Sequence, residues 1–161
     1  MASDISRAVL AVGGQQQFQG VTQVIVAGHA ETLPGDCLRA SVATFFARPL
    51  DEVPHFALFN SWHQALNLWL ADWYDLGARI RPVGGNPPGQ AMYLLIGGSP
   101  RNADWSHIVV SLRGRILWDP HPSRAGLTDQ RQTVEFYLLD QAEEASRRWW
   151  TAHTEQQEAL A

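Results

Sequence analysis

The only cysteine of this 161-residue chain, Cys37, lies at the first turn of a predicted helix. Asp36 before it is a typical N-cap residue. The apolar residues behind it recur at helical spacing and form one stripe: Leu38, Val42, Phe45 and Phe46. We expect a helix from Cys37 to about Arg48, because Pro49 cannot continue it. The free N–H groups and the dipole at a helix N-terminus favour the thiolate form of a thiol, so Cys37 is a candidate nucleophile.

A histidine and an aspartate far downstream stand where two strands can bring them together. His107–Ser111 and Arg115–Asp119 have the composition of strands, and a hairpin loop of three residues favours a glycine at its last position, which here is Gly114. This loop places His107 opposite Asp119, with Cβ atoms about 4.5–5.5 Å apart. A two-residue loop shifts the pairing by one and puts the carboxylate among apolar neighbours, so we expect the longer loop.

A second helix is predicted by its capping signature. Ser61 and Gln64 have the spacing of a capping box, and Gly77 is a suitable C-terminal stop. Apolar residues between them recur at helical spacing, and we expect them to pack in the core: Trp62, Ala65, Leu66, Trp69, Leu70 and Trp73.

The remaining segments predict strands and loops, which gives an α+β fold. β-branched or alternating composition predicts four further strands: Val21–Ala27, Arg79–Val83, Met92–Ile96 and Thr133–Leu139. Gly97–Trp105 is expected to be a loop, and Asp140 with Glu143 has the spacing that caps a last helix. Residues 1–20 are expected to be partly irregular and residues 153–161 to fray.

Composition narrows the function classes. A chain of 161 residues predicts a single domain, 1–161, and its net charge of −4 gives no basic footprint for nucleic acid. The longest apolar stretches, such as Ala91–Ile96, fall short of the roughly 20 residues that a membrane span needs. One cysteine excludes an internal disulfide. We therefore expect a cytoplasmic protein with neither nucleic acid nor membrane as partner.

A zinc site is a competing interpretation of the same residues. Its ligands would be Cys37, His107, Asp119 and His121. The chain has no Cys-x-x-Cys or His-Glu-x-x-His spacing, so we expect no metal and no cofactor.

Five sequence blocks resemble papain-like cysteine peptidases, and more narrowly a group of small uncharacterised bacterial and phage proteins with Gly-Asp-Cys, Ser-His and Asp-Pro-His-Pro motifs. The blocks are Gly35–Ala40, Leu50–Phe56, Gly98–Arg101, Ser106–Val110 and Asp119–Ser123. The resemblance implies a papain-like fold in which the cysteine helix packs on an antiparallel sheet. It also implies Cys37 as the nucleophile, His107 as the base and Asp119 as the third member of a triad.

The resemblance further implies an oxyanion donor some six residues before the cysteine, where the family often has glutamine and this chain has Glu31. Thr32 is a possible substitute, and so is Gln23 if its segment folds back. Arg101 and His121 adjoin the triad strands and are candidates for substrate contact. The expected function is a thiol hydrolase or acyltransferase that acts on an amide, isopeptide or thioester bond of a protein, peptide or small substrate. The alternative is a catalytically silent binding module on the same fold.

Overall fold

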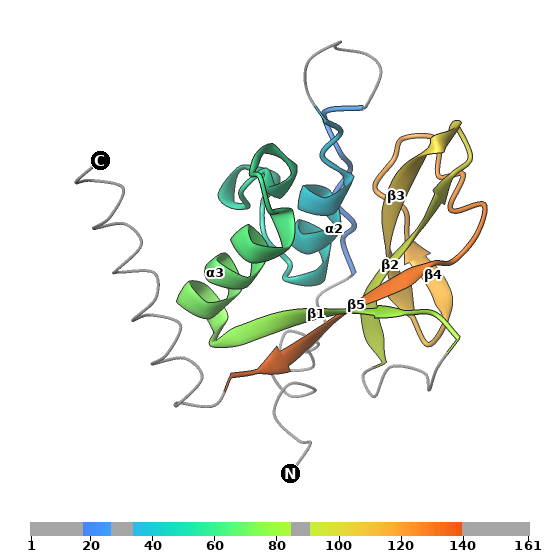
Figure 1. The fold of residues 1–161 in the computed structure, drawn as a ribbon. Helices are drawn as coiled ribbons and strands as arrows, with labels where there is room; N and C mark the ends of the chain where they lie inside the picture. Colours follow the sequence, from blue (N-terminus) through green and yellow to red (C-terminus); the bar gives the residue numbers. More distant parts are fainter. Residues whose placement is uncertain (1–17, 27–33, 85–90, 140–161) are drawn as a thin grey trace.

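The computed structural model describes residues 18–26, 34–84 and 91–139, and these residues form an α+β fold (Figure 1). Five strands make one antiparallel sheet in the order β1-β5-β2-β3-β4. The elements in chain order are α2 (Cys37–Phe45), the short 3₁₀ helices η1 (Leu50–Glu52) and η2 (Phe56–Leu58), α3 (Trp62–Tyr74), β1 (Leu76–Pro82), β2 (Met92–Ser99), β3 (Asn102–Leu112), β4 (Arg115–Trp118) and β5 (Gln132–Leu138). The expected helix after Asp140 and the expected irregular and frayed ends lie outside the described residues, apart from residues 18–20.

The helix α2 begins at Cys37, as the sequence predicts, and packs against the sheet. Leu38 and Val42 are buried in a core that both helices share with the strands. The Ser41 hydroxyl donates a hydrogen bond of 3.1 Å to the carbonyl oxygen of Ile108 in β3, which fixes the helix on that strand. The helix ends at Phe45, before the expected Arg48, and Ala47 has a left-handed φ of 51°.

The helix α3 begins as predicted but ends differently. The Ser61 side chain accepts a hydrogen bond from the Gln64 N–H, which confirms the capping residue. The helix ends at Tyr74, and its C-cap residue Asp75 adopts the left-handed conformation, whereas Gly77 lies inside β1. A side chain at Gly77 would collide with the Tyr137 ring, so close approach explains this glycine. Of the tryptophans expected in the core, Trp73 is 60% exposed, and the prediction is wrong there.

The loop expected at Gly97–Trp105 is absent from the structure. β2 continues to Ser99 and pairs with β3 through a tight turn. Gly97 and Gly98 serve close packing rather than a loop, because a Cβ atom on Gly97 would collide with the backbone oxygen of Asp129. Strand pairing of β2 therefore extends up to the candidate site.

The turn between β3 and β4 also differs from the prediction. It has two residues, Arg113 and Gly114, with φ values of 49° and 81°, as in a type I′ hairpin. Leu112 therefore lies opposite Arg115, one step away from the expected pairing. A β-bulge then shifts the register again, so that Val110 lies opposite Trp118. Such bulges redirect the residues beyond them.

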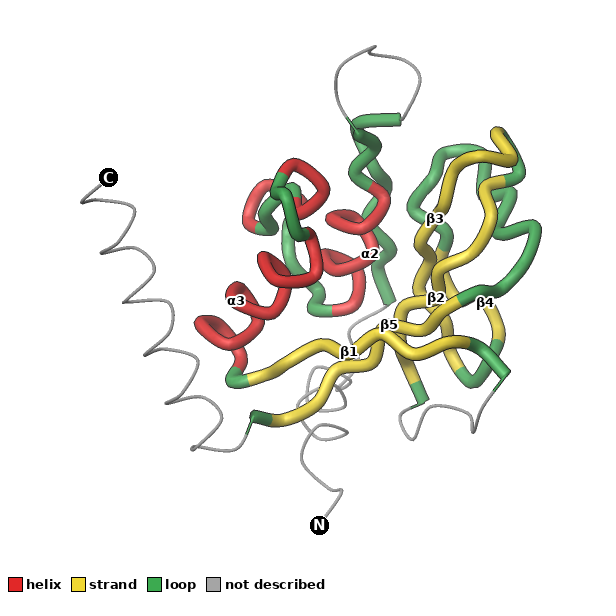
Figure 2. The backbone as a smooth tube through the Cα atoms, viewed as in Figure 1, coloured by secondary structure: helices red, strands yellow, loops and turns green. Residues whose placement is uncertain are grey.

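Residues 18–26 are irregular, so the strand predicted from Val21 is wrong within them; Ala27, the last residue predicted for it, lies outside the described residues. The segment runs beside α2 (Figure 2) and has hydrogen bonds on two sides. The Val21 N–H donates to Thr44 Oγ1 of α2, while the Gln23 N–H donates to the carbonyl oxygen of Pro120. It thus joins the cysteine helix to the chain that follows β4. Among the described residues, no helix has both the length and the apolar composition needed to cross a membrane.

Candidate active site

The structure brings His107 and Asp119 together. Nε2 of His107 lies 2.7 Å from Oδ1 of Asp119, and both side chains are buried. The expected contact is therefore present, although the pairing that predicted it is wrong. The β-bulge beyond Ser111 shifts the pairing by a second residue in the same direction as the shorter turn. Because the total shift is two residues, Asp119, which follows the end of β4, stays on the sheet face of His107.

Asp119 is held by three donors. Besides His107, the backbone N–H groups of His121 and Gly126 donate to its carboxylate at 2.8 and 2.7 Å. Burial raises the pKa of this carboxyl, but these three hydrogen bonds outweigh burial and hold the pKa below its ordinary value. Asp119 is therefore a fixed anion that determines the orientation of the His107 ring.

His107 also interacts with the Cys37 side chain. Its Nε2 is used by Asp119, so Nδ1 is the nitrogen left for the thiol. Burial lowers the pKa of His107, but its interactions with Asp119 and Cys37 outweigh burial and raise the pKa above its ordinary value. Cys37 is half-buried at the first turn of α2. The three residues thus form a connected thiol–imidazole–carboxylate arrangement.

Asp36 occupies the N-cap position of α2 but does not cap it with its side chain. The carboxylate is fully buried and accepts hydrogen bonds from the N–H groups of Val24 and Ile25, at 3.4 and 2.9 Å. The Asp36 N–H donates in turn to the Ile25 carbonyl. Asp36 therefore fixes the segment 18–26 beside the N-terminus of α2.

Of the two oxyanion candidates, Gln23 lies on this segment and Thr32 lies outside the described residues. Gln23 is buried between α2 and Pro120 and donates one amide hydrogen from Nε2 to the Ile25 carbonyl. Its second amide hydrogen has no acceptor among the described residues, and its Oε1 is buried without a partner. The segment 18–26, which carries Gln23, does fold back beside α2 as expected. The oxyanion role remains a prediction.

Arg101 and His121 lie beside the triad, from two different segments. Arg101 follows β2, and its Nη1 lies 3.4 Å from the Ser123 hydroxyl. His121 Nδ1 lies 2.8 Å from the same hydroxyl, and the His121 ring centroid is 6.2 Å from that of His107. The two candidates for substrate contact are thus adjacent to the base.

Sequence reasoning missed the arginine that supports this region. Arg124 donates hydrogen bonds to the carbonyl oxygens of Asp119 and His121 and to the Thr22 hydroxyl, and its guanidinium lies 3.9 Å from the centroid of the Trp118 ring. It ties the turn after Asp119 to the segment 18–26. The only indication of this role in the sequence is that Arg124 closely follows the turn-forming Asp-Pro-His-Pro motif.

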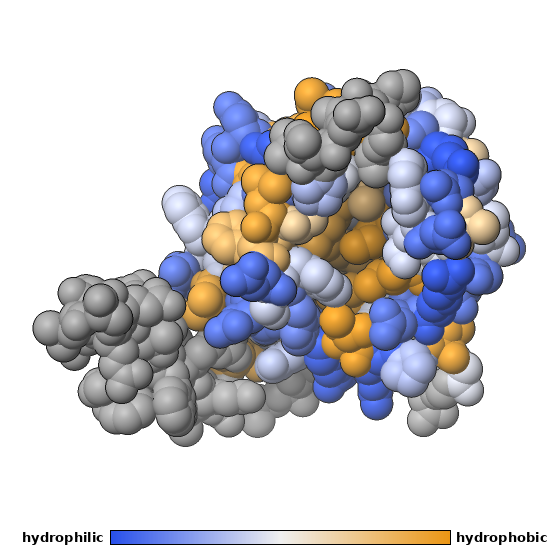
Figure 3. All heavy atoms as spheres, turned by 45° about the horizontal axis from the view of Figure 1, so that its top comes forward, coloured by the Kyte–Doolittle hydropathy of each residue, from blue (hydrophilic) through white to orange (hydrophobic). Residues whose placement is uncertain are grey.

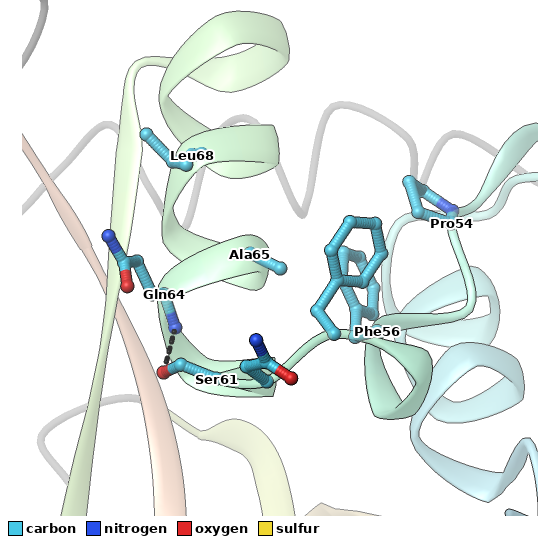
Figure 4. A pocket seen from close by; sticks show the side chains of 8 residues that line it. Pro54, Phe56, Ser61, Gln64, Ala65 and Leu68 are labelled. Carbon is cyan, nitrogen blue, oxygen red and sulfur yellow. Dashed lines mark hydrogen bonds between the residues drawn. The ribbon is translucent and has the colours of Figure 1, made fainter. Parts of the chain in front are cut away.

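Two hollows lie apart from the triad. One of about 390 Å³ is formed by η2 and α3, with Phe56, Ala65 and Leu68 in its lining (Figure 4). The other, of about 380 Å³, includes Asp36 and Arg39. Figure 3 shows hydrophobic surface between the helical part and the strands, on the side where α2 begins.

No group of three or more histidine, cysteine or acidic residues able to hold a metal ion occurs in the described ranges.

Comparisons with known proteins identify no relative of this chain. A scan against protein-family models, a search of curated proteins and a search of solved structures each found no match. The functional conclusion therefore depends on the geometry of the site.

Proposed function

We propose that this chain is a thiol hydrolase or acyltransferase with a papain-like arrangement of Cys37, His107 and Asp119. The observation that carries the proposal is the position of His107, whose Nε2 lies 2.7 Å from a buried carboxylate and whose pKa is raised in part by the Cys37 thiol at a helix N-terminus. A histidine with a raised pKa beside a thiol supports the thiolate–imidazolium pair that nucleophilic catalysis needs.

The proposed reaction has two steps. The Cys37 thiolate attacks the carbonyl carbon of an amide, isopeptide or thioester, and His107 protonates the leaving group as the bond to it breaks. Water, or a second nucleophile in acyl transfer, then gives its proton to His107 and cleaves the acyl-thioester. Asp119 keeps the ring oriented throughout.

Two donors are available for the tetrahedral oxyanion. The Cys37 N–H lies in the first turn of α2, where backbone N–H groups have no intrahelical acceptor. The second amide hydrogen of Gln23 is the other donor that we propose. Donors at such a site lower the barrier because they are fixed before charge develops on the oxygen.

The alternative is a catalytically silent binding module on the same fold. The bond between Gln23 Nε2 and the Ile25 carbonyl favours it, because the chain's own backbone already accepts that amide hydrogen. A peptide or small amide bound beside Cys37 would then remain uncleaved.

Turnover of p-nitrophenyl acetate, an activated acyl donor, separates the two functions. An enzyme releases p-nitrophenol beyond one equivalent per chain, and Cys37→Ala abolishes this release without unfolding the protein, because alanine suits a helix. Release that stops at one equivalent, or a Cys37→Ala variant as fast as the wild type, contradicts the enzyme proposal.

A further inference from the structure

Arg101 lies close to the site and, among the described residues, pairs with no carboxylate. Arg48, Arg79 and Arg131 each form an ion pair with a carboxylate of the chain. Arg101 is exposed, and among the described residues its guanidinium contacts only the Ser123 hydroxyl, at 3.4 Å. A guanidinium has five N–H donors in a fork that matches a carboxylate. Most of those donors have no acceptor among the residues that the structure describes.

His121 has a second donor that lacks an acceptor among the described residues. Its Nδ1 accepts a hydrogen bond of 3.0 Å from the Ser123 N–H, so the proton of the neutral ring is on Nε2. That Nε2 atom is buried and has no partner among the described residues. A buried N–H without an acceptor costs free energy, which a ligand oxygen placed there recovers.

The two donors belong to one network beside the base. Arg101 donates to the Ser123 hydroxyl, which lies 2.8 Å from His121 Nδ1. Burial and the charges of Arg101 and His107 lower the pKa of His121, which keeps the ring neutral beside the His107 imidazolium. Arg124, by contrast, is occupied by backbone and hydroxyl oxygens. The surface formed by Arg101, Ser123 and His121 thus carries positive charge and has hydrogen-bond donors without acceptors among the described residues.

We infer that Arg101 and His121 form a carboxylate-binding subsite, and that the acyl substrate carries a carboxylate close to the bond that is cleaved. This inference depends on the proposed function, since Cys37 supplies the attack. It deepens that function by naming the substrate class as an anionic amide or thioester. Arg101 binds the carboxylate through its fork, and His121 Nε2–H donates to one of its oxygens.

Alkylation of Cys37 by two reagents tests this subsite without knowledge of the natural substrate. In both reactions the sulfur displaces iodide and forms one S–C bond, but iodoacetate carries a carboxylate where iodoacetamide carries a neutral amide. We expect Arg101→Gln to lower the ratio of the iodoacetate rate to the iodoacetamide rate by about threefold, the size of an exposed charge interaction. His121→Ala should lower the same ratio.

Arg115→Gln is the matched control, because it removes the same charge from an exposed arginine at the turn end of β4. Equal ratios in Arg101→Gln, Arg115→Gln and wild type overturn the subsite. If His107→Ala reacts with iodoacetamide as fast as the wild type while the ratio still depends on Arg101, the result contradicts the proposed function and leaves the subsite in place.

Protection by simple anions identifies the bound group. At equal ionic strength, acetate should slow iodoacetate labelling of the wild type more than inorganic phosphate does. Protection by phosphate alone overturns the assignment to a carboxylate.

Discussion

Two buried aspartates flank the cysteine and the histidine, and they differ in what they hold. Among the described residues, the carboxylate of Asp36 accepts hydrogen bonds from two backbone N–H groups, those of Val24 and Ile25. The carboxylate of Asp119 accepts two backbone N–H groups and also the imidazole of His107. Both side chains are almost completely buried, at 0% and 4% exposure.

The comparison teaches that burial of a carboxylate does not identify a catalytic one. Asp36 fixes a segment of backbone, so its loss should affect the fold first. Asp119 fixes a ring that must keep one tautomer, so its loss should affect chemistry first. The following substitutions test whether the two roles separate in this way.

Asp36→Ala should give the largest effect. It leaves two backbone N–H groups without an acceptor in a buried place, and we expect a loss of about 3 kcal/mol in the free energy of unfolding. Urea denaturation measures this loss. The control is Asp51→Ala, an exposed aspartate of η1, with an expected change within about 0.5 kcal/mol. Equal stability of the two variants would contradict the role of Asp36.

Asp119→Asn should preserve the fold but slow turnover of p-nitrophenyl acetate by about a hundredfold or more. The amide cannot accept from His107 and from both backbone groups as the carboxylate does, so the ring loses its orientation. Circular dichroism checks the fold beside the rate. If the variant unfolds while its remaining folded fraction keeps the wild-type rate, Asp119 is structural like Asp36.

Gln23→Ala tests whether the segment that Asp36 holds also takes part in chemistry. We expect turnover of p-nitrophenyl acetate to fall about tenfold, at the lower end for loss of an oxyanion donor. Alkylation by iodoacetamide should change little, because displacement of iodide forms no tetrahedral oxyanion. An equal decrease of both rates would show that Gln23 only positions Cys37.

The pH dependence of stability should differ modestly between the wild type and Asp119→Asn. The pKa of Asp119 is lower in the folded protein than its ordinary value of 3.8, so the unfolded chain takes up the proton first as pH falls. Its stabilising contribution is complete at neutral pH and is lost as pH falls through the folded value. Urea midpoints measured below about pH 5 should therefore decrease more steeply in the wild type than in the variant. Parallel curves would contradict this linkage.

The sequence predicts the elements of this fold better than their ends and register. N-cap positions and periodicity correctly place the starts of α2 and α3, at Cys37 and Trp62, because both signals are local. Only Ser61 of α3 caps its helix with its side chain. The glycines mislead, since Gly77 and Gly97 allow close packing between distant segments that no local pattern reveals. The bulge in the β3–β4 hairpin is equally hidden.

The candidate site is predictable to a similar degree. His107 and Asp119 are named correctly as a pair in contact although the predicted pairing is wrong, because the shorter turn and the bulge together shift the register by two residues and keep both side chains on one face. The support around them is tertiary. Nothing local indicates that Asp36 bonds to Ile25, or that Arg124 joins Thr22 to the turn after Asp119.

The most direct test of the account measures the coupling between Cys37 and His107. Iodoacetamide labelling of the wild type, His107→Ala and the control His63→Ala is followed between about pH 5 and pH 9. His63 bonds to Asn67 of α3 and to the Ala78 carbonyl of β1 and has no bond to the triad, so its variant should follow the wild type. We expect His107→Ala to react more slowly near neutral pH and to approach the wild-type rate at the alkaline end, where the thiol ionises without help. Identical profiles for all three proteins would show that the thiol and the imidazole are not coupled, and the binding module would then replace the enzyme.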